Sequence, residues 1–384
     1  MKQALLLILG IISWVAASAT APRVFFVNIY PGDEVYELEG HSALVVDEGG
    51  PAIAYNYGVF DFNSPNFIYR FVKGETDYML AAYPFALFLH SYREQGRRTV
   101  AHELDLDSVQ ATRLAAMLKE NADPANRVYR YNYVKDNCAT RPLAMVERAL
   151  GDSIVLAPAP FEAQPLLKPT FRNIMRHYHR NYPWYQFGID LALGSGIDYP
   201  ISRREMSFAP AELDAMLAGA TVGGRPLVRS TRVLTDTPAD AVPLPATPWY
   251  LTPIIICWLF FGITAAVTIA GVRRNRVFRG FDAAFFGLMG LTGLVLTFLI
   301  FVSVHEATSP NWLYVWLNPL CLAVPVLAWW HSARPVLRTY YILYAAALTL
   351  LLCFWWALPQ SANPAFFPLM GAALLRSAAG ALRK

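Results

Sequence analysis

Hydrophobic and polar positions in the first 150 residues follow two different periods. Apolar side chains alternate with polar ones, or run together between Gly- and Pro-containing turns, at 24–30, 39–46, 52–57, 98–106 and 129–134, and these stretches predict strands. The aromatic and apolar run 66–89 has helical character. An amphipathic pattern capped by Ser108 predicts another helix through Asn121. The pattern therefore predicts an α+β domain built on a small antiparallel sheet.

Long apolar runs dominate the remainder of the chain. They cover 250–272, 281–303, 313–330 and 339–358, and a weaker one starts at Phe366. The loops between the first and second runs and between the third and fourth carry arginines, as does the C-terminus, whereas 304–312 and 359–365 contain no Lys or Arg. By the positive-inside rule, this asymmetry predicts an all-α bundle of about five transmembrane helices with a cytoplasmic C-terminus and an external N-terminal part.

Composition and the N-terminus agree with this topology. Only 16% of the 384 residues are charged, and Lys2 precedes an apolar run at 5–15 and a small-residue segment at 17–21. We expect a signal peptide (1–21), an extracytoplasmic domain (22–234), a Pro-rich linker (235–248) and a transmembrane domain (249–384). An uncleaved anchor is the alternative to the signal peptide. The net charge of +4 forms no polybasic face, so no nucleic-acid partner is expected.

Cys138 is the only cysteine in the segment predicted to be exported. A lone thiol in an oxidising compartment needs a reason, and catalysis is the most economical one. Cys138 precedes a helical pattern that stops at Gly151, and either Asn137 or Thr140 fits the cap of that helix. In both cases we expect the helix start to stabilise a thiolate and lower the thiol pKa.

A thiol nucleophile needs a base, and His41 is the strongest candidate because it follows a glycine and opens an apolar strand. Asn56, on the next predicted strand, is a candidate orienting residue, although it could equally serve the sheet or an oxyanion hole. His177 and His179 lie two residues apart with no third ligand nearby, so we interpret them as polar positions of a solvated helix and expect no metal site.

Several motifs resemble one family when taken in chain order. Residues 40–44 (GHSAL), 55–62 (YNYGVFDF), 71–74 (FVKG), 78–80 (YML) and 136–141 (DNCATR) look like the N-terminal extracytoplasmic domain of the bacterial lipoprotein N-acyltransferase Lnb family. Residues 187–194, 311–312 and 318–319 extend the likeness into the membrane region. More remotely, the order of His41 and Cys138 is similar to permuted papain-like folds such as lecithin retinol acyltransferase.

The resemblance implies a Cys-His acyltransferase that needs no cofactor. Cys138 would take an acyl chain as a thioester, with His41 as base, and pass it to an amine; in the family, the chain moves from a lipoprotein glyceryl ester to the lipoprotein's own N-terminus. Tyr57, Lys73 and Arg141 are the candidate substrate-binding residues, and Lys73 and Arg141 could equally be surface charges. Membrane lipid or lipoprotein is the expected partner.

Two other functions fit parts of the same pattern. A papain-like amidase or peptidase acting on cell-wall peptides could use the same residues, but it would not need five membrane spans. A non-catalytic envelope assembly module would leave Cys138 without a chemical role. Aromatic residues of the N-terminal domain could line an acyl groove or simply fill the core: Phe67, Tyr69, Phe71, Tyr83, Phe85 and Phe88.

Overall fold

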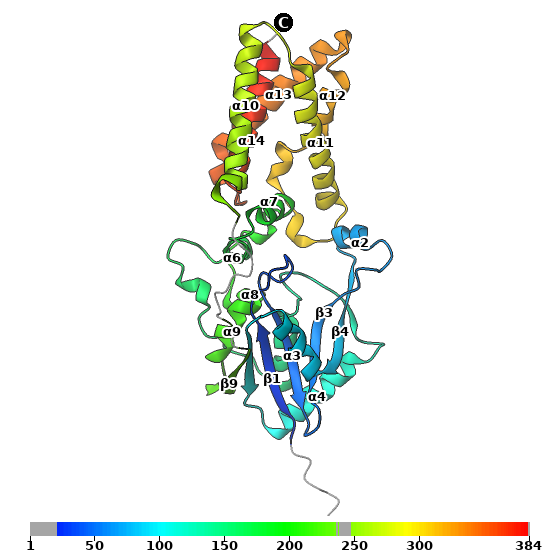
Figure 1. The fold of residues 1–384 in the computed structure, drawn as a ribbon, viewed down its shortest axis with the longest axis vertical. Helices are drawn as coiled ribbons and strands as arrows, with labels where there is room; N and C mark the ends of the chain where they lie inside the picture. The colour runs from blue at the N-terminus through cyan, green and yellow to red at the C-terminus, as the bar shows by residue number, and fades with distance from the viewer. Residues whose placement is uncertain (1–20, 236, 238–246, 383–384) are drawn as a thin grey trace, which may run out of the picture.

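The computed structural model describes residues 21–235, 237 and 247–382. A sheet-containing domain occupies one end of the molecule and a bundle of helices the other (Figure 1). The predicted signal peptide and most of the predicted linker lie outside the described residues. The predicted α+β class and the order of the two parts are confirmed.

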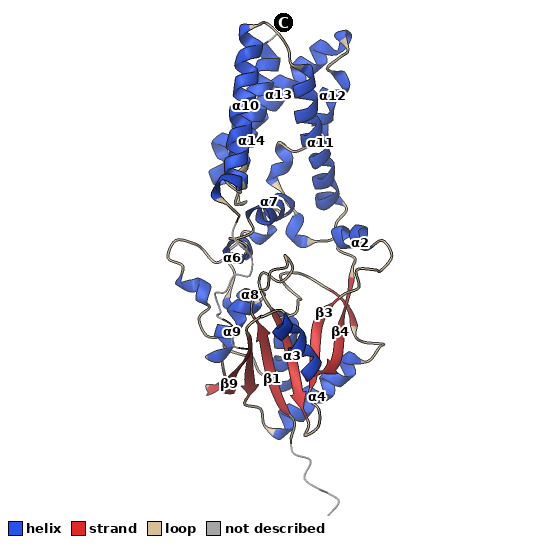
Figure 2. Cartoon of the chain, viewed as in Figure 1, coloured by secondary structure: helices blue, strands red, loops and turns tan. Residues whose placement is uncertain are grey.

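The N-terminal domain is built on a seven-stranded sheet within the described residues, and every strand pair is antiparallel. Its strands, drawn in red in Figure 2, are in spatial order β6 (Val128–Arg130), β4 (Asp77–Pro84), β3 (Ile53–Val59), β2 (His41–Asp47), β1 (Arg23–Ile29), β5 (Thr99–Leu104) and β9 (Val228–Thr235). A separate hairpin pairs β7 (Thr221–Val222) with β8 (Arg225–Pro226).

Alternate residues of the central strands enter two hydrophobic clusters, as the period of a strand requires. Phe26 and Leu44 belong to the larger cluster, which includes side chains of α4 (Ser108–Ala122) and α5 (Thr140–Leu150). Val27 and Val45 point the other way and pack with Phe88 of α3 (Phe85–Glu94). Both faces of the sheet are therefore covered.

Two sequence expectations in this domain are wrong. The run 66–89 is not continuously helical: α2 (Phe67–Lys73) and α3 flank β4, which pairs with β3 and alternates between buried and exposed side chains. In a short aromatic run, the helical period and the strand period cannot be told apart, so only the pairing with a neighbouring strand identifies β4. The cap of α4 is Asp107 and not Ser108, because the Asp107 carboxylate accepts the Gln110 N–H at 2.8 Å.

The segment after Gly151 connects the two parts of the molecule. It contains α6 (Phe171–Tyr178), α7 (Pro183–Ala192), α8 (Arg203–Met206) and α9 (Pro210–Ala218) before β9 completes the sheet edge. Arg172 of α6 is fully buried and pairs with Asp190 at 2.8 Å and Asp198 at 2.7 Å.

The helical part contains three helices long and apolar enough to cross a membrane: α10 (Pro253–Arg273), α11 (Arg279–Phe301) and the stretch His331–Ala357, which includes α13 (Arg334–Phe354). Two shorter apolar segments accompany them, α14 (Phe366–Leu382) and the broken segment Trp312–Leu327, which ends in α12 (Ala323–Leu327). The predicted apolar runs are thus present, but the count of five complete spans stays a prediction.

Backbone contacts fix the helical part to the segment 171–198. The Gly194 N–H donates to the Ala307 carbonyl and the Ser195 N–H to the Pro310 carbonyl, each at 2.8 Å. A Cβ on Gly194 would lie 2.3 Å from the Pro310 oxygen, so this close approach needs glycine. Asn363 also donates to the buried Asp190 carboxylate at 3.0 Å. The sheet domain is therefore held against the membrane helices.

Candidate active site

Cys138 lies in the loop immediately before α5, and Asn137 organises that loop. The Asn137 Oδ1 atom accepts the N–H groups of Ala139 and Thr140 at 2.9 and 3.0 Å, while the Thr140 hydroxyl accepts the Asn137 N–H at 2.9 Å. The sequence expectation for the cap is wrong, because the N-cap residue of α5 is Ala139; Asn137 and Thr140 instead take part in one reciprocal arrangement around it. It fixes the backbone on either side of the sulfur.

The sulfur lies where β2 and β3 separate. The two strands pair only from Leu44 to Val46, although β2 extends back to His41 and β3 forward to Val59. The Ser42 N–H and the Tyr131 phenol lie close enough to the Cys138 sulfur to lower the pKa of its thiol. On the β3 side, Gly58 has a φ of +90°, and a Cβ there would lie 3.4 Å from the Cys138 Cβ. Gly58 thus combines a backbone conformation that other residues avoid with space for the cysteine.

The thiol pKa contradicts the expectation from sequence. Burial raises the pKa of Cys138 to about 11, although the N–H groups of Ser42 and Cys138 and the Tyr131 phenol act in the lowering direction. The side chain is only 8% exposed, so the loss of hydration disfavours the thiolate more than the helix start and its neighbours favour it. At neutral pH, Cys138 is therefore a neutral thiol.

Asn56 lies directly behind the imidazole of His41. The His41 Nε2 and Asn56 Oδ1 atoms are 2.6 Å apart, and the Asn56 amide donates to the Tyr83 hydroxyl at 3.0 Å. Because an amide oxygen can only accept, His41 Nε2 carries the proton and donates. Nδ1, which has no hydrogen-bond partner within the described part of the chain, then holds the basic lone pair.

Burial lowers the pKa of His41 to about 4, and the positive charge of Arg97 acts in the same direction, whereas the bond to Asn56 opposes it. His41 is therefore a neutral imidazole. The next residue in the chain is Ser42, whose N–H faces the Cys138 sulfur. That His41 and Cys138 form one site, with direct proton transfer between Nδ1 and the sulfur, stays a prediction.

The three predicted substrate-binding residues lie in different settings. Tyr57 is fully buried and donates to Asn121 at 2.8 Å. Lys73, at the end of α2, pairs with Glu75 at 2.8 Å. Arg141 makes two bonds to Asp136 at 2.8 and 2.5 Å, and its guanidinium lies 3.8 Å from the centre of the Tyr129 ring. Substrate binding by all three stays a prediction, and each side chain already has a structural partner.

A row of aromatic rings connects α2 with the thiol. We call it the aromatic row: Phe71, Phe67, Phe60, Tyr78 and Tyr131. Successive ring centres are 5.8, 5.7, 5.0 and 4.2 Å apart. Tyr131 in turn lies beside the Cys138 sulfur. Of the aromatics suggested for an acyl groove, Phe67 and Phe71 belong to this row, whereas Phe88 is in the core.

Helix α2 lies beside the end of α11 (Figure 1). It has no buried residue, and Ile68 is 77% exposed. The Ser303 hydroxyl and the Val304 N–H donate to carbonyls at the end of α2, at 2.8 and 2.9 Å. His305, whose role the sequence left open, donates through Nε2 to the Phe71 carbonyl at 2.8 Å. These bonds hold an apolar helix at the level where the membrane helices end.

Several neighbours of the thiol gave no recognisable signal in the sequence. Arg97 is 3% exposed, pairs with Glu37 at 2.7 Å, and contributes its charge to the surroundings of both His41 and Cys138. Tyr131 and Ser42 were visible only as members of strand-like runs. Their contacts depend on strand pairing over long sequence separations, which no local pattern reports.

The interpretation of His179 as a solvated position is wrong. Its side chain is fully buried, with Nε2 2.6 Å from a Glu39 oxygen and Nδ1 2.7 Å from the Gln186 oxygen. His177 instead contacts the edge of Phe161. No cluster of metal-ligating residues occurs among the residues described.

A thiol before a helix, an imidazole on a neighbouring strand and an amide behind that imidazole are the residue types of a papain-like thiol site. Here they belong to a domain fixed to membrane helices. The chain belongs to the Lnb family: residues 13–175 match the family's Lnb N-terminal periplasmic domain and residues 245–384 its Lnb transmembrane domain. No curated protein and no solved structure matched the chain. Membership suggests a lipoprotein-modifying membrane acyltransferase whose N-terminal domain is extracytoplasmic.

Proposed function

We propose that this protein transfers an acyl chain from a lipid or lipoprotein glyceryl ester to an amine, the lipoprotein N-terminus, through a thioester on Cys138. The observation that carries the proposal is the position of the Cys138 sulfur where β2 and β3 separate, beside the N–H of Ser42, which is the residue after the Asn56-bound His41. Family membership supplies the class of reaction.

In the first half-reaction, the thiol proton moves to His41 Nδ1 as the sulfur attacks the ester carbonyl. The C–S bond forms, the ester C–O bond breaks, and the departing glyceryl oxygen takes the proton from His41. In the second half-reaction, the amine attacks the thioester, the C–N bond forms and the C–S bond breaks. The proton lost by the amine returns through His41 to the sulfur.

A neutral thiol and a neutral imidazole in the resting protein suit this order of reaction steps. A thiol with a pKa of about 11 and an imidazole with a pKa of about 4 do not exchange a proton spontaneously at neutral pH. Transfer therefore accompanies attack on the carbonyl, where the developing oxyanion gains hydrogen bonds. The N–H groups of Ser42 and Cys138, which face the sulfur, are our candidates for this role.

The aromatic row gives the acyl chain a route to the thiol. Its outer end is α2, which exposes Ile68 and half of Phe71 beside the membrane helices, and its inner end is Tyr131 at the sulfur. Exposed apolar residues on a helix at this level fit the interfacial zone of a bilayer. A lipid substrate is thereby favoured over a soluble peptide.

The test uses the full-length protein in detergent with a diacylated lipopeptide whose amino group is N-acetylated. This substrate can donate an acyl chain but cannot accept one, so the thioester should accumulate. Intact mass should rise by one acyl group, and hydroxylamine should remove it. Cys138→Ala should show no adduct, whereas the matched variant Cys353→Ala, at an exposed cysteine of α13, should show it.

The same assay with a free amino group separates the other functions. The proposal expects N-acylated peptide and a lyso product in equal amounts. Cleavage of a peptide bond would indicate the amidase, and release of free fatty acid alone would indicate a lipase. An inert substrate, together with full biological activity of Cys138→Ala, would indicate the assembly module. Each of these three results would overturn the proposal.

A further inference from the structure

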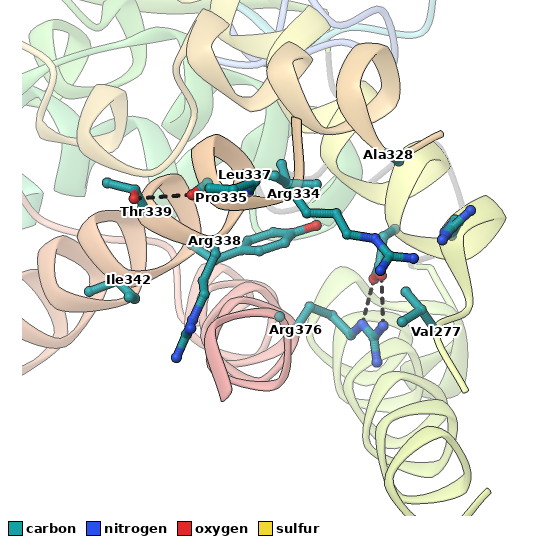
Figure 3. A pocket seen from close by; sticks show the side chains of 13 residues that line it. Val277, Ala328, Arg334, Pro335, Leu337, Arg338, Thr339, Ile342 and Arg376 are labelled. Carbon is teal, nitrogen blue, oxygen red and sulfur yellow. Dashed lines mark hydrogen bonds and ion pairs between the residues drawn. The ribbon is translucent and has the colours of Figure 1, made fainter. Parts of the chain in front are cut away.

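A second candidate site lies at the end of the helical part farthest from the sheet domain. A cavity of about 560 Å³ opens there between the beginnings of α11 and α13 and the end of α14. Arg334 and Arg338 of α13 and Arg376 of α14 are among the residues around it (Figure 3). Arg279, at the start of α11, also lines the cavity. Because the N-terminal domain is extracytoplasmic, helices that cross the membrane bring this end to the cytoplasmic surface.

The arginines of this cavity are not balanced by acidic residues. Arg376 is buried and bonds to both oxygens of Asp282 at 2.6 and 2.8 Å, so this pair is neutral. Residues 249–384 contain only one other acidic side chain, Glu306, which pairs with Lys135 at the opposite end of the helices. Among the residues that the structure describes, three cavity arginines therefore have no acidic partner.

The guanidinium groups of these three arginines are also largely free to donate. Arg338 gives one N–H to the Ala381 carbonyl at 2.9 Å. Arg279 and Arg334 have no side-chain partner within the described ranges. A planar guanidinium with unpaired N–H groups matches the oxygens of a phosphate.

Two long helices add their positive ends to the same cavity. α11 has 23 residues and begins at Arg279, and α13 has 21 residues and begins at Arg334. Neither helix has a side chain that caps its first turn. The partial positive charge at the starts of these two helices favours a negative charge.

Apolar residues occupy the side of the cavity that continues along the helices. Leu337 and Ile342 of α13 line it, and Val277 contributes from the loop before α11. Ile342 is 49% exposed, on a helix that is apolar enough to cross the membrane. A ligand with an anionic head and apolar tails would satisfy both parts of this surface.

We propose that this cavity binds the phosphate headgroup of an anionic phospholipid from the cytoplasmic leaflet, such as phosphatidylglycerol. The phosphate lies between Arg279, Arg334 and Arg338, and the acyl tails run along α13. Basic pockets between transmembrane helices on the cytoplasmic side are sites of this kind. The bound lipid would hold the cytoplasmic ends of α11, α13 and α14 together, independently of the chemistry at Cys138.

The test is native mass spectrometry of the full-length protein released from mixed micelles of phosphatidylglycerol and phosphatidylcholine. The wild type should retain phosphatidylglycerol at least fivefold over phosphatidylcholine and unfold at a higher temperature when it is present. The double variant Arg334→Gln/Arg338→Gln should bind it at least tenfold more weakly. Arg273→Gln/Arg274→Gln removes the same charge from exposed residues outside the cavity and should bind like the wild type.

Several results would overturn the proposal. Equal retention of the two lipids by the wild type would show that the headgroup charge is not recognised. Equal loss in both double variants would indicate general attraction to the basic end of the protein. If inorganic phosphate alone reproduces the thermal shift and displaces the lipid, the ligand is a free phosphate. The single variant Arg334→Gln, which removes an exposed side chain, repeats the test if the double variant does not fold.

Discussion

Two clusters of buried polar groups differ in charge: the thiol site, and the ion-pair cluster between the sheet domain and the membrane helices. We call this second cluster the joint: Arg172, Arg176, Asp190, Asp198 and Asn363. At the thiol site, burial keeps Cys138 and His41 neutral at physiological pH. At the joint, Arg172 and Asp190 are almost completely buried as ions, and their charges are satisfied by paired side chains from several segments. Neutral groups can exchange a hydrogen-bond partner for a substrate at little cost, whereas a buried ion cannot. This difference in charge distinguishes the thiol site, which we propose to be reactive, from the ion pairs that fix the two parts of the molecule together.

The largest effect should come from removing the thiol. Cys138→Ala should abolish acyl transfer, a loss of at least about 10³-fold, because no other group can carry the acyl chain. The thermal unfolding midpoint should change little, since the substitution removes only a small, uncharged thiol. Product formation measured by mass spectrometry, beside an unfolding curve, checks both parts. Loss of folding together with activity would assign Cys138 a structural role and weaken the comparison.

Breaking the joint should instead cost stability. Asp190→Ala leaves Arg172 and Arg176 without a shared partner and should lower the free energy of unfolding by about 3–5 kcal/mol. Glu48→Ala, which removes the partner of the exposed Lys119, is the matched control and should cost less than about 1 kcal/mol. Denaturant unfolding of the two variants measures the contrast. Similar losses of unfolding free energy in both variants would mean that the buried ion pairs contribute no more to stability than the exposed one.

A smaller effect is expected from the amide behind His41. Asn56→Ala removes the acceptor that holds Nε2–H and should lower kcat by about 10- to 100-fold, a fraction of the contribution of a general base. Asn56→Asp should restore part of the rate, since a carboxylate also accepts from Nε2. Tyr83→Phe, one bond farther away, should change kcat by less than Asn56→Ala. An unchanged kcat in Asn56→Ala would remove Asn56 from the site.

The sequence predicted much of this comparison, because its strongest signals are local. Three alternating runs correspond to β1, β2 and β3, and the helical pattern that ends at Gly151 corresponds to α5. These two features place His41 at the start of a central strand and Cys138 just before a helix that packs on the sheet. The apolar runs similarly predicted the membrane helices, although two of them are too short or too broken to count as clear spans.

Features that depend on distant contacts could not be predicted. β9 is an exposed edge strand with Arg, Ser and Thr in its sequence, and only its pairing with β5 identifies it. His179 meets Glu39 across 140 residues, so no spacing rule reveals the pair. The thiol pKa was predicted in the wrong direction because the helix start is visible in the sequence, whereas the burial that outweighs it is a property of the packed domain.

The smallest expected effect is that of pH on the acid side, and it tests the neutral site directly. A base must be unprotonated to accept the thiol proton, and burial lowers the pKa of His41 to about 4. With the N-acetylated lipopeptide, which has no titrating amine, the rate of thioester formation on Cys138 should therefore change by less than about twofold between pH 8 and pH 5.5, whereas a histidine with the ordinary pKa of about 6.5 would lose most of its activity there. The unfolded chain binds a proton at His41 below about pH 6.5 and the folded chain does not, so this residue makes stability fall as pH decreases from 6.5 towards 4. Initial rates measured only where the unfolding curve shows a folded protein separate the two effects. An acid limb near pH 6.5 would show that His41 is hydrated in the working enzyme and that the thiol site is not the neutral, buried counterpart of the charged joint.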